Sequence, residues 1–133
     1  MRLWHQELID KLPRQQLLGQ HRECCALRGK GWGKKHATVN YVFEYDPARL
    51  VAYHRLVIGE MLDRGYNPDQ TWEHPDYRGK KIGFDQSFCD VDDVVEYYFS
   101  GIIYPEHNDE YSKECTDNLA EKECVCRYME EVM

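Results

Sequence analysis

The sequence lacks an apolar run long enough to cross a lipid bilayer, because charged residues make up 31% of its 133 positions. A membrane-spanning helix needs about 20 consecutive apolar residues, so a membrane-spanning protein is excluded. Internal repeats and low-complexity tracts are also absent. Glu7 and Asp10 interrupt the first ten residues, which is unlike a secretory signal. We therefore expect a soluble, cytoplasmic protein with a single domain over residues 1–133.

The six cysteines lack the paired Cys-x-x-Cys spacing that is typical of zinc sites. They cluster only at Cys24-Cys25 and at Cys124-Val125-Cys126, and adjacent cysteines rarely bind one metal well. In a reducing compartment, free cysteines persist and pack like small apolar residues. We therefore expect ordinary thiols, no metal and no cofactor. The alternative is a metal site built from Cys124, Cys126 and a nearby histidine, which metal analysis of the purified protein would test.

The net charge of −7 hides a strong asymmetry along the chain. Residues 1–40 carry eight cations and three anions, a net charge of +5, whereas residues 84–133 carry three cations and fourteen anions, a net charge of −11. Such a split suggests a basic working surface near the N-terminus that could meet a phosphate backbone. The alternative is that the basic and acidic segments simply pack near one another.

Four segments combine helical apolar spacing with helix end signals. They are residues 14–27, 47–64, 90–99 and 109–131. Asp46 followed by Pro47 is a favourable helix start, and Gly101 is a favourable stop. Residues 37–45 alternate weakly, and we expect a strand or an extended connector there. The fold class is therefore predicted as all-α, a compact single domain of about four helices with long irregular loops.

Glu23 is the sharpest local feature of the predicted first helix. At 100° per residue it lies on the polar face, where its neighbours are Gln16, Gly19, Gln20 and Ala26. The small side chains of Gly19 and Ala26 leave space around the carboxylate, so a ligand could approach it. The alternative is an ordinary solvated glutamate that pairs with a neighbouring cation.

The run LPRQQLLGQHRE at residues 12–23 resembles the first helix of the phage-type pyrimidine-dimer DNA glycosylases, the endonuclease V type. The pattern there is Leu-x-x-Gln-x-Leu-x-x-x-aromatic-Arg-Glu near the chain start. The similarity continues, in the same order, in HAT at 36–38, EMLDRGY at 60–66 and PDYRG at 75–79. It covers about residues 1–83 and fades through the acidic part, residues 84–133.

The resemblance implies an all-α enzyme that binds duplex DNA, extrudes a base and cleaves the glycosidic bond at a pyrimidine dimer. In that family the chain's own α-amine attacks the sugar to give an imine, and a lyase step then breaks the strand. The amine would belong to Met1, or to Arg2 if the initiator is removed. Glu23 matches the family's general acid/base, and Arg2 would assist as an oxyanion contact.

The resemblance also implies a set of DNA contacts, with a damaged duplex as the partner and a monomeric protein. Arg22 would hold a phosphate close to the lesion, and Gln16 stands where the family has histidine. We expect further contacts from the cations and the imidazole near the predicted loops. The full expected set is Arg22, Gln16, Lys34, Lys35, His36 and Arg78. The alternative function is a non-catalytic module of the same fold that binds nucleic acid or protein.

Overall fold

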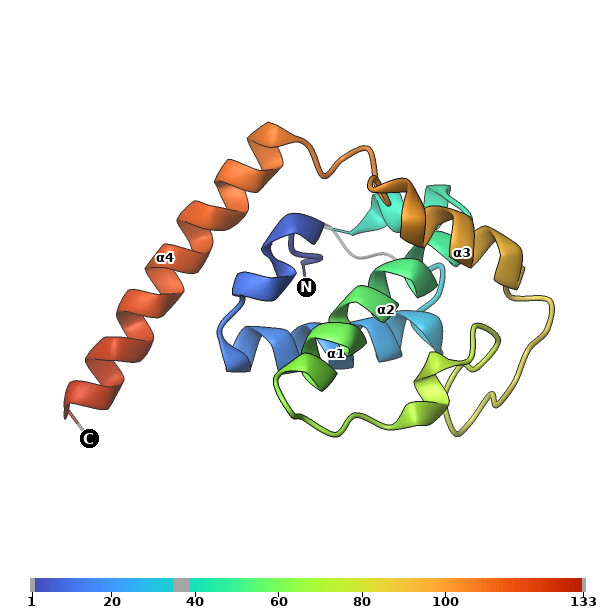
Figure 1. Ribbon diagram of the computed structural model, residues 1–133, viewed down its shortest axis with the longest axis horizontal. Coiled ribbons are helices and arrows are strands. Elements are labelled where there is room, and N and C mark those ends of the chain that lie inside the picture. The colour runs from blue at the N-terminus through green and yellow to red at the C-terminus, as the bar shows by residue number, and fades with distance from the viewer. Residues whose placement is uncertain (1, 35–38, 133) are drawn as a thin grey trace.

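The computed structural model describes residues 2–34 and 39–132, with side chains through residue 120. Four α-helices and three short 3₁₀ helices make up the regular structure of this part of the chain (Figure 1). In chain order they are η1 (Gln6–Lys11), α1 (Arg14–Arg28), η2 (Asn40–Glu44), α2 (Pro47–Asp63), η3 (Gln70–Glu73), α3 (Val91–Ser100) and α4 (Asp109–Val132). The all-α prediction is confirmed. Within the described residues, no helix has the length and apolar character that a membrane span requires.

The helix ends follow the local signals in the sequence. Asp46 accepts a hydrogen bond from the backbone N–H of Ala48 at 2.9 Å, and Pro47 opens α2. Asp90 caps α3 in the same way. Gly101 ends α3 at a φ of +84°, a left-handed conformation that glycine adopts without steric cost.

The predicted strand or extended connector is wrong for residues 40–44, which form the 3₁₀ helix η2; residues 37 and 38 lie outside the described part. Val39 and Val42 are both fully buried, and the backbone N–H of Val42 donates to the carbonyl of Val39 at 3.0 Å. Residues three apart eclipse each other in a 3₁₀ helix, so one face carries both valines into the core. Burial at that spacing decides the local structure, and the weak alternation of aromatic residues does not.

Helix α2 is the centre of the core. It contacts α1, α3, η1 and η2, and Figure 1 shows it crossing the middle of the molecule. One stripe of α2 is buried along its whole length, namely Leu50, His54, Val57, Ile58 and Met61. Full burial of each aliphatic member stabilises the fold by about 1.5–3 kcal/mol. This helix therefore fixes the position of α1, which carries Glu23.

Candidate active site

The side chain of Gln20 joins the start of the chain to Glu23. Gln20 is 1% exposed, and its Oε1 accepts a hydrogen bond from the backbone N–H of Trp4 at 2.7 Å. Its Nε2 donates to the carbonyl oxygen of Arg2 at 2.9 Å and to Oε2 of Glu23, also at 2.9 Å. One amide group therefore holds the second residue of the chain next to the Glu23 carboxylate.

Two tyrosines from other helices hold the same N-terminal segment. The Tyr53 hydroxyl on α2 donates to the carbonyl of Trp4 at 2.5 Å and lies 2.9 Å from Oε1 of Gln20. The Tyr111 hydroxyl on α4 donates to the carbonyl of Leu3 at 2.5 Å. Burial raises the pKa of both tyrosines, so both hydroxyls carry their proton at neutral pH. Helices α1, α2 and α4 thus converge on residues 2–4.

The Arg2 side chain extends toward α4. Its guanidinium lies 3.4 Å from Oε1 of Glu114 and stands over the rings of Trp4, at 5.7 Å, and Tyr111, at 5.9 Å. The Glu114 side chain is 58% exposed, so this ion pair is worth less than about 1 kcal/mol. The backbone of Arg2 faces Gln20, while its side chain contacts α4. The role of Arg2 as an oxyanion contact therefore stays a prediction.

The surface of α1 is open one turn before Glu23. Gly19 lies one turn before it on α1, and a Cβ atom added at Gly19 would meet no heavy atom within 4 Å. Ala26, one turn after it, is exposed. Gln16 is half-buried, and among the described residues its Oε1 is a buried atom without a hydrogen-bond partner. The surface of α1 is therefore open at Gly19, and the space around the Glu23 carboxylate stays a prediction.

Four of the expected DNA contacts can be sorted by whether the structure describes them. Arg22 and Lys34 are exposed, as a phosphate contact requires. Lys35 and His36, like the proposed nucleophile Met1, lie outside the described residues.

Arg78 has structural partners. Its Nε donates to the carbonyl of Arg28 at 2.8 Å, one terminal nitrogen donates to the carbonyl of Gly29 at 3.2 Å, and the other pairs with Asp85 at 3.1 Å. Hydrogen bonds to Asp85, from Ser87 first and then from Arg78, lower the pKa of that carboxyl. Arg78 thereby ties the loop after η3 to the end of α1, and its phosphate contact stays a prediction.

The sequence matches a known protein family. The family described as pyrimidine dimer DNA glycosylase matches residues 1–74, which is more than half of the chain. The chain belongs to this family. The matched segment contains Gln20, Glu23 and Tyr53, but not Tyr111. Neither the curated proteins nor the solved structures include a match. Family membership assigns the chain to DNA repair, with damaged DNA as its class of partner.

Proposed function

We propose that this protein is a DNA glycosylase with associated abasic-site lyase activity, which acts on pyrimidine dimers or related lesions through an imine formed by its N-terminal amine. The observation that carries the proposal is the amide of Gln20, which bonds to the backbone of Arg2 and to Glu23 at once. The backbone of Arg2 therefore lies next to a carboxylate, and an α-amine at Arg2 or at the residue before it would complete the pair of groups that this chemistry needs.

The residues suit the successive steps. An α-amine has a pKa of about 8, so a useful fraction is neutral and nucleophilic at neutral pH. Its nitrogen bonds to the anomeric carbon of the sugar as the bond to the base breaks, and the departing base takes a proton. The sugar ring then opens at the bond between the anomeric carbon and the ring oxygen, the ring oxygen takes the proton that leaves the amine, and the resulting iminium acidifies the neighbouring carbon. Glu23 takes a proton from that carbon, and the electron pair expels the 3′ phosphate, which breaks the strand. The amine and the carboxylate needed for these steps both belong to this chain.

The surface around Glu23 suits an extruded lesion. The gap above Gly19 gives a flipped nucleotide room, and flipping a damaged, poorly stacked base costs less than flipping a sound one. Exposed Arg22 and Lys34 supply cations for the phosphates on either side. In this proposal Gln16, Lys35, His36 and Arg78 are further contacts.

Borohydride trapping on a duplex with one abasic site tests the proposal. Native protein should give a covalent adduct, and acetylation of its N-terminal amine should abolish it. Glu23→Gln should still form the adduct but cleave the strand more slowly, whereas Glu44→Gln, a change at an exposed residue of η2, should behave like the native protein. Folded native protein that gives no adduct on either dimer or abasic duplexes would overturn the proposal.

A further inference from the structure

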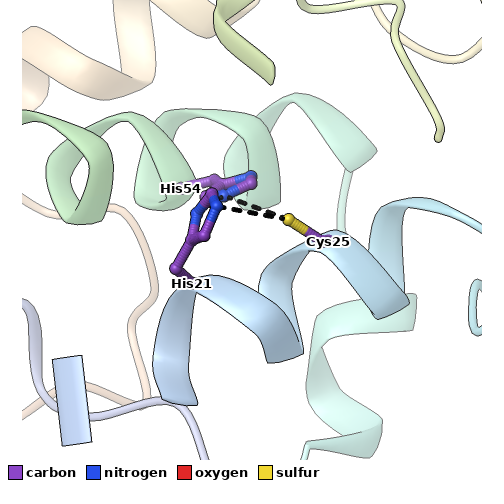
Figure 2. A group of neighbouring side chains, drawn as sticks. All are labelled: His21, Cys25 and His54. Carbon is purple, nitrogen blue, oxygen red and sulfur yellow. Dashed lines mark hydrogen bonds between the residues drawn. The ribbon is translucent and has the colours of Figure 1, made fainter. Parts of the chain in front are cut away.

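Three side chains with metal-binding atoms meet between α1 and α2. Figure 2 shows His21 and Cys25 on α1 pointing toward His54 on α2. Nδ1 of His21 lies 2.9 Å from Nε2 of His54, and the sulfur of Cys25 lies 3.8 Å from Nε2 of His21 and 3.9 Å from Nε2 of His54. With one donor atom taken from each residue, all three atoms lie within 4.8 Å of one another.

The helices hold these donors in place. His21 and Cys25 are four residues apart, so they share one face of α1, and Glu23 points the opposite way. His54 belongs to the buried stripe of α2 and is fully buried, whereas His21 and Cys25 are half-buried. A site on two packed helices is better ordered than one on loops, and its half-buried side can admit a fourth ligand.

The donor atoms of the three side chains can be compared with the spacing in a tetrahedral metal site. Zinc bonds of about 2.0–2.1 Å to nitrogen and about 2.3 Å to sulfur place two nitrogens about 3.3 Å apart and nitrogen about 3.6 Å from sulfur. The 2.9 Å contact involves Nδ1 of His21, whereas the 3.8 Å contact involves its Nε2, so one nitrogen of His21 does not make both. With one donor atom from each residue the three atoms lie within 4.8 Å of one another, at most about 1.5 Å wider than the tetrahedral spacing. A rotation of the His21 ring, together with movements of the neighbouring side chains, would close this difference, and imidazole with thiolate is a donor set that zinc prefers.

Arg28 sets the proton balance of such a site. Its guanidinium is fully buried and donates to Nδ1 of His54 at 3.0 Å, so the proton of the neutral His54 ring stands on Nε2. A divalent metal at Nε2 must therefore bind His54 as an imidazolate, whose Nδ1 still accepts from Arg28, and Cys25 as a thiolate, and the two protons pass to solvent. Because two protons leave for each divalent ion, the net charge of the buried group stays the same. The positive charge of Arg28 therefore does not exclude the metal.

We propose that His21, Cys25 and His54 bind one divalent metal ion of the zinc class, with a fourth position left to water or an added ligand. The ion would link α1 to α2 on the face of α1 opposite Glu23, where it stabilises the fold and takes no part in the proposed imine chemistry. The site is thus independent of the proposed function.

Cobalt(II), added to the metal-free full chain, is a suitable probe because it gives a thiolate-to-cobalt charge-transfer band and intense visible bands in tetrahedral sites. We expect one equivalent to produce both. Cys25→Ser should abolish the charge-transfer band and weaken binding at least about 100-fold, since even changes to groups behind the ligands weaken binding 10- to 100-fold. Cys24→Ser is the matched control, because Cys24 is the neighbouring buried thiol and lies outside the group.

A second variant and a second readout guard against loss of folding. His21→Gln removes a half-buried ligand, and circular dichroism reports whether each variant keeps its helices. Zinc should raise the Tm of the native protein and of Cys24→Ser, but not that of Cys25→Ser or His21→Gln. The proposal is overturned if native protein gives no charge-transfer band, or if the band persists in folded Cys25→Ser.

Discussion

Replacing Gln20 tests the proposed site most directly, because the two atoms of its amide group have different partners. Oε1 accepts from the backbone of Trp4 inside the core, whereas Nε2 donates to Arg2 and Glu23. Gln20→Glu keeps the shape of the side chain and its acceptor oxygen but removes the donor. Gln20→Leu removes both. The pair of variants therefore separates the structural role of the amide from its role in the proposed reaction.

The expected effect of Gln20→Glu is electrostatic. The new carboxylate oxygen would stand where Nε2 now lies, 2.9 Å from Oε2 of Glu23. Two carboxylates at that distance cannot both ionise, so they share a proton and the pKa of one of them rises strongly. The shared proton makes Glu23 a weaker base until the pH is high enough to remove it from the pair. We expect strand cleavage to slow about 100-fold, the lower end of what general base catalysis contributes, and to recover as the pH is raised.

Gln20→Leu should act on both stability and positioning. The backbone N–H of Trp4, a residue that is 6% exposed, loses its acceptor, and a buried unsatisfied donor costs about 1–3 kcal/mol. We expect the free energy of unfolding to fall by about 2 kcal/mol. The start of the chain also loses its bond next to Glu23, and a misplacement of about 1 Å can cost about 100-fold in rate. Imine trapping should therefore slow by about that factor.

Two measurements check these expectations: urea unfolding for stability, and the initial rates of trapping and strand cleavage on an abasic duplex from acidic to basic pH. The reasoning fails if Gln20→Glu cleaves at the native rate with an unshifted pH profile. It also fails if Gln20→Leu is destabilised as expected but forms the imine as fast as the native protein. Either result would mean that the amide supports the fold without aligning the amine and the carboxylate.

Three further predictions concern other positions. Gly19→Ala and Gly59→Ala should each raise the free energy of unfolding by up to about 1 kcal/mol, because alanine is the better helix former and neither methyl group would meet a heavy atom within 4 Å. Only Gly19→Ala narrows the space beside Glu23, so fluorescence anisotropy should show weaker binding of a dimer-containing duplex for it alone; equal binding by both would contradict the proposed pocket. Tyr111→Phe should slow trapping at saturating DNA about tenfold and leave the Kd for DNA unchanged. A raised Kd with an unchanged trapping rate would argue against a positioning role. Burial lowers the pKa of His107 to about 3, so the folded protein keeps this ring neutral. The free energy of unfolding therefore falls as the pH drops below about 6.5, the pKa of histidine in the unfolded chain. Between about pH 7 and about pH 5, urea unfolding should show about 2 kcal/mol less loss of stability for His107→Gln than for the native protein. An equal loss in the two proteins would refute the role given to His107.

The helices could be predicted because their signals are local. Asp46 before Pro47 and the pair of Asp90 and Gly101 lie within a few residues of the ends they define, and the structure places the helix ends there. The helical period also placed Glu23 and Gly19 on one face of α1. The prediction was wrong at residues 40–44, which form a 3₁₀ helix. Core packing favours the three-residue spacing of buried side chains there, and no local sequence signal indicates it.

The contacts that complete the site could not be predicted in this way, since they join residues far apart in the chain. Gln20 was expected on the polar face, and it is nevertheless buried because residues 2–4 cover it. Tyr53 offered a usable signal: it directly precedes His54 in the buried stripe of α2, so a wider stripe would have included it. Tyr111 offered none, because 108 positions separate it from Leu3.

The acidic part of the chain therefore has a structural role despite its charge. The family match ends at residue 74, yet α4 beyond it supplies the Tyr111 hydroxyl that holds residue 3. The exposed acidic side chains of its first turns, among them Glu110 and Asp117, would repel a phosphate backbone. Because Arg22, which precedes Glu23 on α1, and Lys34 are both exposed, we infer that DNA approaches from α1 with α4 turned away. In this inference the charge asymmetry of the sequence orients the duplex, while the Tyr111 contact on α4 holds Leu3 and with it the start of the chain.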